Sequence, residues 1–164
     1  MFHSFMSAIT PYLIVLCWLV LSACGKVAQG EGTRTDPQQA LTIAAQGSQL
    51  AFDTATLQVQ GGNEIKLTLK NNSNNFKHNW VLVNGNTEIA DAVYKAALAA
   101  GEQSDFLPDT MNAVLTHTAL VAAGQQETIA FTAPVVPGSY TFLCTFPGHY
   151  LAGMKGTLMV TTPE

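Results

Sequence analysis

Short apolar runs separated by turn-forming residues recur along the chain from Leu41 onward. Alternation of apolar and polar positions is typical of a strand with one buried face, and residues 65–69 alternate strictly. Glycine, asparagine and proline mark the turns between runs, for example at residues 61–63 and 137–138. The pattern predicts strands at residues 41–45, 56–60, 65–69, 79–83, 115–121, 127–132, 139–144 and 156–161.

One segment, residues 87–100, follows the period of a helix instead. Asn86 or Thr87 can cap its first turn, and Gly101 can end it. Its apolar face is predicted to consist of Ile89, Val93, Ala96, Ala97 and Ala100. Seven or eight short strands with one inserted helix predict an all-β fold, an antiparallel Greek-key β-sandwich.

The first two dozen residues form a separate unit. An apolar run at residues 11–20 leads into Leu21-Ser22-Ala23-Cys24, a tetrapeptide that resembles the bacterial lipobox. The run is short for a membrane span and ends in small residues, as a signal peptidase requires. We therefore expect a lipoprotein signal peptide at residues 1–23, acylation of Cys24, a flexible tether at 24–40 and the folded domain at 41–164.

The segment before this run carries His3 but no Lys or Arg, which departs from the usual signal pattern. The alternative is an N-terminal anchor helix that is never cleaved. Both versions predict an exported domain, held at the outer face of the cytoplasmic membrane.

Composition narrows the functional classes. Lys and Arg total 7 against 11 Asp and Glu, a formal net charge of −4, and every charged residue follows Cys24. An acidic chain of this kind is not a nucleic-acid binder. A length of 164 residues fits one domain, which we expect to be monomeric.

Three cysteines are present, but Cys17 would leave with the signal and Cys24 would carry lipid. Cys144 then has no partner for an internal disulfide. It is an inert buried residue, a reactive nucleophile or a metal ligand.

Three metal-ligating side chains follow one another at five-residue steps between two predicted strands: Cys144, His149 and Met154. Thiolate, imidazole and thioether together suit copper. A trigonal copper site needs a second imidazole, and His78 lies at the mouth of the strand predicted at 79–83. His117 has no such neighbours and is expected to be a surface histidine, and Trp80 a core residue.

Residues 77–82 (KHNWVL), 144–149 (CTFPGH) and 154–158 (MKGTL) resemble azurin and, most closely, the auracyanins of photosynthetic bacteria. The resemblance implies a blue copper protein of cupredoxin fold, in which His78, Cys144, His149 and Met154 bind one copper ion. It implies that the backbone N–H groups of Asn79 and Phe146 donate to the thiolate, and that the Asn79 side chain ties the two ligand segments together.

Two positions differ from azurin. Four residues rather than three separate His149 from Met154, as in auracyanins, and Lys77 stands where azurin has a glycine before its first ligand histidine. Whether the Lys77 carbonyl is a fifth contact stays open.

The family likeness also implies redox partners: a membrane quinol oxidoreductase on one side and a reaction centre or a cytochrome c on the other. No charge lies between Cys144 and Met154, so Tyr150, Leu151 and Ala152 are predicted to form an apolar contact surface.

Two rival classes compete with an electron carrier. A Cys-His hydrolase would use Cys144 with His149 or His117, but it gives Met154 no role. A copper store or chaperone would need open, exchangeable coordination, whereas this ligand set closes around the metal. The sequence therefore favours a one-electron carrier and not an enzyme.

Overall fold

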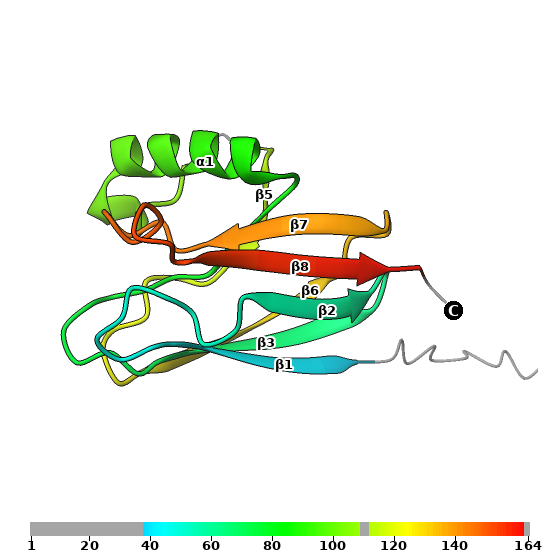
Figure 1. Cartoon of the computed structure of the whole chain (residues 1–164), viewed down its shortest axis with the longest axis horizontal. Helices are drawn as coiled ribbons and strands as arrows, with labels where there is room; N and C mark the ends of the chain where they lie inside the picture. Colours follow the sequence, from blue (N-terminus) through cyan, green and yellow to red (C-terminus); the bar gives the residue numbers. More distant parts are fainter. Residues whose placement is uncertain (1–37, 109–111, 163–164) are drawn as a thin grey trace, which may run out of the picture. The chain divides into compact units, whose positions relative to one another are not determined.

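A computed structural model describes residues 38–108 and 112–162. Within these ranges eight strands form two sheets beside one α-helix (Figure 1). The signal peptide predicted at 1–23, Cys24 and the tether up to residue 37 lie outside the described residues. No helix in the described ranges is both long enough and apolar enough to span a bilayer.

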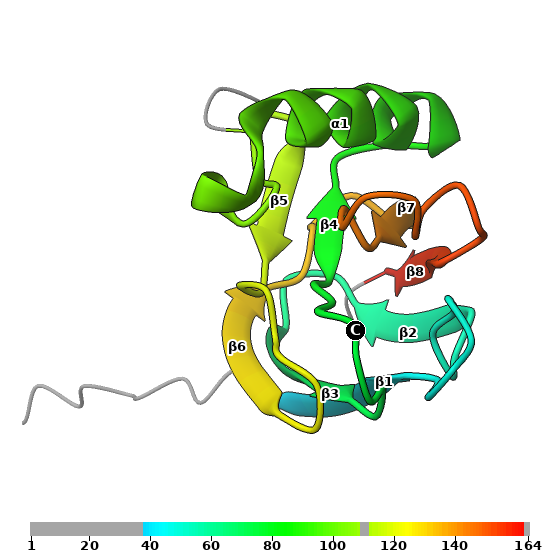
Figure 2. The ribbon, with the colours of Figure 1, turned by 90° about the vertical axis from the view of Figure 1, so that its left-hand side faces the viewer.

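The first sheet has the order β1-β3-β6, and the second has the order β2-β8-β7-β4-β5. The strands are β1 (Gln39–Ala45), β2 (Thr56–Gln60), β3 (Glu64–Asn71), β4 (Val81–Val83), β5 (Val114–His117), β6 (Gln126–Thr132), β7 (Gly138–Leu143) and β8 (Lys155–Thr161). Strand β1 begins at Gln39, two residues before the predicted strand and within the range assigned to the tether. Figure 2 looks along the sandwich and shows α1 outside the second sheet.

The prediction of a wholly antiparallel sandwich was wrong. Strand β1 pairs with β3 in parallel, and β2 pairs with β8 in parallel, while the other pairs are antiparallel. The reason is that Gly61 and Gly62 turn the chain between β2 and β3, which belong to different sheets. Two successive reversals bring β3 back beside β1 in the same direction.

Apolar side chains from both sheets fill the space between them. The alternating residues of β3, Ile65, Leu67 and Leu69, are buried as predicted, and Trp80 is fully buried in the same cluster. Burial of each large apolar side chain contributes about 1.5–3 kcal/mol. This core fixes the strand ends from which the metal ligands project.

Helix α1 (Thr87–Ala100) has the predicted bounds and caps. The Asn86 side chain accepts hydrogen bonds from the N–H groups of Glu88 and Ile89, and Gly101 ends the helix at a φ of 76°. The predicted apolar face was wrong in part, because Ile89 is exposed and Ala96 and Ala100 are only half-buried. The buried residues of α1 are Ala90, Val93, Tyr94 and Ala97. Tyr94 lies on this face because its hydroxyl contacts the loop between β7 and β8.

Two strands are shorter than predicted. Strand β4 lacks the first two residues of the expected range 79–83, and β5 ends at His117 rather than at Val121. The Thr118 hydroxyl accepts the Trp80 N–H at 2.9 Å, so a side chain replaces part of the backbone ladder. His78 and Val121 then form an isolated bridge.

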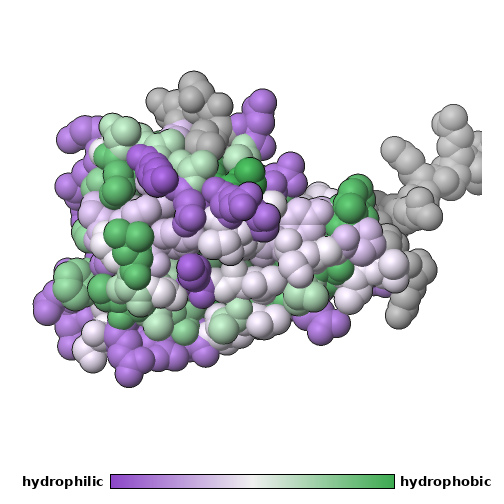
Figure 3. All heavy atoms as spheres, turned by 45° about the horizontal axis from the view of Figure 1, so that its top comes forward, coloured by the Kyte–Doolittle hydropathy of each residue, from purple (hydrophilic) through white to green (hydrophobic). Residues whose placement is uncertain are grey.

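A short 3₁₀ helix, η1 (Glu102–Ser104), follows α1. On the face shown in Figure 3, polar and apolar residues are interspersed.

Candidate metal centre

Four potential ligands come from two segments at one end of the sandwich. His78 is fixed before β4 by its two backbone hydrogen bonds with Val121, of 3.1 and 2.8 Å. Cys144 follows β7 directly, and Met154 immediately precedes β8. The N–H of Cys144 donates to the Met154 carbonyl at 3.1 Å, and the N–H of Met154 donates to the His149 carbonyl at 3.0 Å. The backbone therefore closes the loop that carries three of the four ligands.

The donor atoms lie as a shared metal ion requires. Cys144 Sγ is 3.8 Å from His78 Nδ1 and 3.5 Å from His149 Nδ1, and the three ligand atoms lie within 4.8 Å of one another. An ion bonded to sulfur at about 2.3 Å and to nitrogen at about 2.0 Å in a trigonal plane would separate these atoms by about 3.7 Å. The donor set therefore fits one metal ion.

The site is closed to solvent. His78, Cys144 and Met154 are fully buried, and His149 is 2% exposed. Burial raises the pKa of Cys144 to about 12. Burial, together with the neighbouring His149, lowers the pKa of His78 to about 4, and burial lowers that of His149. Both imidazoles are thus neutral donors at pH 7, and metal binding must displace the thiol proton.

Two backbone groups and one amide side chain organise the thiol. The backbone N–H groups of Asn79 and Phe146 hydrogen-bond to Cys144 and lower its pKa against the larger effect of burial. The Asn79 side chain accepts the Thr145 N–H at 2.8 Å and donates to the Thr145 hydroxyl at 2.7 Å. The Asn79 side chain therefore ties the His78 segment to the Cys144 segment. Contacts of this kind orient ligands and tune the metal.

Two phenylalanine rings lie next to the imidazole of His149. Its ring lies 4.7 Å from that of Phe146 and 5.5 Å from that of Phe76, measured between centroids, and Phe106 packs on Phe146. Sequence reasoning missed Phe76 and Phe106 as neighbours of the site. The position of Phe76, two residues before His78, was a usable signal. The sequence held no signal for Phe106, because its place beside Phe146 depends on the tertiary fold, in which its backbone adopts a positive φ of 52°.

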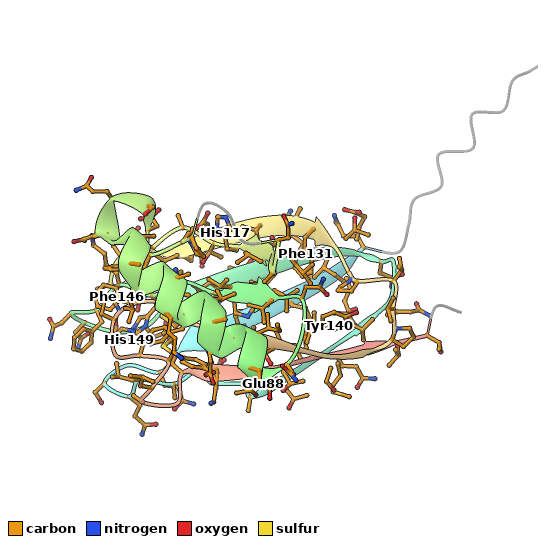
Figure 4. All side chains as sticks on the ribbon, turned by 90° about the horizontal axis from the view of Figure 1, so that it is seen from above. Glu88, His117, Phe131, Tyr140, Phe146 and His149 are labelled. Atoms are coloured by element: carbon orange, nitrogen blue, oxygen red, sulfur yellow. The ribbon has the colours of Figure 1, made fainter. Side chains whose placement is uncertain are left out.

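Two other predictions concern residues near this loop. His117 is exposed on β5, as expected, and Figure 4 shows it well apart from His149 and Phe146. Tyr150 was predicted to lie on the surface, which is wrong, because it is buried against α1 and its hydroxyl donates to Asp91. Leu151 and Ala152 are exposed.

Residues 39–161 match the family model of copper binding proteins, plastocyanin/azurin family. The chain belongs to this family. The donor set, its spacing and its burial agree with the match, and copper is the cofactor, with His78, Cys144, His149 and Met154 forming a typical blue copper site. The cupredoxin-like sandwich predicted from the sequence is thereby confirmed.

Auracyanins of two photosynthetic bacteria are similar to the chain. Auracyanin-B of Chloroflexus aurantiacus is 44% identical over 130 residues, a match that covers 76% of this chain but only 53% of the relative. The crystal structure of reduced auracyanin from Roseiflexus castenholzii is 41% identical, with a TM-score of 0.72, covering 75% of this chain and 97% of the other. Auracyanin A of C. aurantiacus, described as a "blue" copper protein, is 35% identical with a TM-score of 0.72, covering 76% and 99%.

Proposed function

We propose that the protein is a type 1 (blue) copper electron carrier that shuttles one electron between Cu(I) and Cu(II). The observation that carries this proposal is the closed donor set: a thiolate, two imidazoles and a thioether, buried between the ends of strands. Copper bound there supplies a redox couple that accepts and releases single electrons.

The residues of the chain hold this site in one arrangement. The isolated bridge with Val121 fixes His78, and the closure of the loop onto the start of β8 fixes Met154 relative to Cys144. The Asn79 and Phe146 N–H groups stabilise the thiolate charge of Cys144. Because the sheets and these hydrogen bonds set the ligand positions, little rearrangement accompanies electron transfer.

Hydrolase chemistry fits the site poorly. A cysteine nucleophile needs a lowered pKa and access to substrate, whereas Cys144 is fully buried and its pKa is raised to about 12. A copper store or chaperone remains the second candidate. The burial of the site disfavours a store or chaperone, which needs exchangeable metal. Of the four ligand residues, His149 alone has any exposed surface, and that is only 2%.

A tether at the outer face of the cytoplasmic membrane, on the periplasmic side, completes the proposal. It rests on the apolar run and the Leu-Ser-Ala-Cys tetrapeptide at residues 21–24. Replacement of Cys24 by Ser should release or misprocess the protein without altering its colour. Mass spectrometry that finds an unacylated N-terminus downstream of Cys24 in the native protein would contradict it.

The proposed partners are redox proteins: a membrane quinol oxidoreductase as one, and a reaction centre or a cytochrome c as the other, in a photosynthetic or respiratory chain. The apolar residues bordering His149 support a contact surface for them, since Leu151 is 77% exposed and Phe76 is 44% exposed. We propose that a monomer makes this contact.

The absorption spectrum of the oxidised, copper-loaded protein tests the electron-carrier function. Thiolate-to-copper charge transfer should give an intense visible band, and ascorbate should bleach it reversibly. The Cys144→Ser variant should lack the band. A colourless copper-loaded protein, or one that reacts with thiol reagents while loaded, would show that the proposal is wrong.

A further inference from the structure

The loop that carries His149 makes hydrogen bonds within itself and also contacts the rest of the domain. Its own turns are closed by the N–H of Ala152 donating to the Gly148 carbonyl and that of Gly153 donating to the Tyr150 carbonyl, both at 3.0 Å. Gly148 and Gly153 adopt φ values of 86° and 104°, which glycine reaches without strain. Glycines at both ends make the loop conformationally permissive, so its position depends on contacts outside it.

Helix α1 supplies two of these contacts. The Tyr94 hydroxyl oxygen accepts the Gly148 N–H at 2.7 Å, directly before His149. The Tyr150 hydroxyl donates to Asp91 Oδ1 at 2.6 Å, directly after His149. A hydrogen bond to a carboxylate is about twice as strong as a neutral one. Both backbone neighbours of the ligand are therefore fastened to the same helix.

Packing reinforces these hydrogen bonds. The Tyr94 and Tyr150 ring centroids lie 5.1 Å apart, and the Lys155 ammonium lies 4.8 Å from the centre of the Tyr150 ring. Both tyrosines are buried in an apolar cluster that is separate from the main core. The other buried members of this cluster are Val81, Val83, Ala90, Val93 and Leu143. Residues of α1, β4 and β7 thus form a second packed region that faces the loop.

We propose that Tyr94 and Tyr150 are positioning residues that fasten the His149 loop to α1 and so fix the His149 imidazole relative to the Cys144 thiolate. The inserted helix is then a structural support of the copper site. This inference rests on copper binding and not on electron transfer. Its tests read the copper site directly, so their failure would leave the electron-carrier function untouched.

The first experiment removes single hydroxyl groups. In Tyr94→Phe, transfer of Cu(I) to excess bathocuproine disulfonate should be about tenfold faster, because one hydrogen bond worth about 1.4 kcal/mol no longer holds the loop. In Tyr150→Phe, which loses the stronger bond to a carboxylate, the transfer should be at least as fast. The electron paramagnetic resonance spectrum of the Cu(II) forms should broaden, since His149 then samples more than one position.

Tyr140→Phe is the matched control. The Tyr140 hydroxyl likewise makes one hydrogen bond, donating to the backbone carbonyl of Val136 at 2.9 Å, but Figure 4 shows this residue far from His149. The control should lower the melting temperature to a similar extent and leave Cu(I) release and the spectrum unchanged. If it accelerates release as much as Tyr94→Phe does, or if the two loop variants release copper at the wild-type rate, the tyrosines do not position the ligand.

Two further measurements keep the inference testable if a tyrosine variant folds poorly. Asp91 is exposed, so Asp91→Ala should fold, and it should accelerate release as much as Tyr150→Phe, with no further increase in the double variant. Asp91→Asn, which keeps an acceptor oxygen, should restore most of the wild-type rate. In the wild-type protein the Gly148 amide should be protected from hydrogen exchange, and exchange at the rate of a free amide would overturn the proposal.

Discussion

His78 illustrates how burial restricts one ligand residue. With Nδ1 as the ligand atom, the neutral ring carries its proton on Nε2, and among the described residues this atom is buried without a hydrogen-bond partner. An unsatisfied buried donor costs about 1–3 kcal/mol. Protonating the ring would add a charge beside His149 in the same closed site. Burial of this charge, with His149 beside it, keeps the His78 imidazole neutral, so that Nδ1 is available to bind a metal.

The lowered histidine pKa values predict a pH dependence of stability in the copper-free protein. Folding lowers the pKa of His78 from its ordinary value of 6.5 to about 4, and it also lowers the pKa of His149. Between these values the unfolded chain binds protons that the folded protein does not. The free energy of unfolding should therefore fall as pH decreases from 6.5 to 4, by roughly 3 kcal/mol for His78, with no contribution above pH 6.5.

Urea unfolding of the copper-free protein between pH 4 and pH 7 measures this dependence. Acidic groups also titrate in part of the range, so the comparison is with variants. His78→Gln should show a shallower slope than the wild type, whereas His117→Gln, which alters an exposed histidine, should keep the wild-type slope. Equal slopes in all three proteins would show that His78 is not held neutral.

Met154 should affect the potential more than the colour. Replacing it by Leu removes the thioether but keeps the buried volume, which costs less than about 1.5 kcal/mol in stability. Loss of a weak donor disfavours Cu(II) more than Cu(I), and a difference of about one to two kcal/mol corresponds to roughly 40–90 mV for a one-electron couple. Voltammetry of Met154→Leu should show this rise while the visible band persists. An unchanged potential would mean that the thioether does not contact copper.

Among the elements, the β7–β8 pair shows how close packing supports the ligands at its end. Gly156 lies opposite Phe142 in this pair, and Phe142 packs against Trp80 and Phe52 in the core. A Cβ atom at Gly156 would collide with the Phe142 ring and would lie 2.6 Å from the carbonyl oxygen of Ala55. The position thus needs glycine for space and not for a special backbone conformation.

Gly156→Ala should therefore destabilise the domain by about 3 kcal/mol, the upper range for overpacking a core. Thermal and urea unfolding of the copper-loaded and copper-free forms measure the loss. Thr157→Ala, one position along the same strand, should cost less than about 1 kcal/mol. If both substitutions have equal effects, the Phe142 ring moves aside freely and the packing is looser than the contacts indicate.

For the whole molecule, the proposed contact with redox partners depends on the charges near His149. Lys77, next to His78 in the chain, forms a salt bridge of 2.8 Å with Glu102 of η1, so these two charges largely cancel each other. Lys155 lies over the Tyr150 ring. Phe76 and Leu151 are the large apolar residues exposed beside the ligand loops. This surface therefore carries little net charge, despite the formal charge of −4 on the chain.

Electron exchange should accordingly depend weakly on salt, changing less than about twofold between low and physiological ionic strength, since no charged face steers the partner. Leu151→Asp should slow self-exchange about tenfold, because an unpaired carboxylate must then be desolvated at the contact, while the absorption spectrum stays the same. Val135→Asp, at another highly exposed apolar residue between β6 and β7, is the control and should exchange at the wild-type rate. Unchanged exchange in Leu151→Asp would place the electron's exit elsewhere.

The sequence alone indicated the features that depend on residues close together in the chain. Cys144, His149 and Met154 fall within one loop, so their spacing predicted a copper-binding segment, and the caps at Asn86 and Gly101 gave the helix its bounds. Alternation in β3 predicted its buried face, because side chains of a strand point to opposite sides in turn. His78 was chosen for its place at the start of a predicted strand, and the resemblance to a known family supported the choice, because a local pattern does not pair residues so far apart.

Only the tertiary structure decided what depends on contacts between distant segments. It determined that β1 and β3 run in parallel, that Tyr94 rather than Ile89 lies on the buried face of α1, and that Tyr150 turns from the surface to Asp91. Apolar periodicity tells which residues can be buried, but several rotations of a helix or loop satisfy it almost equally. The choice among them comes from side-chain packing and hydrogen bonds across the fold, which no single segment of the sequence contains.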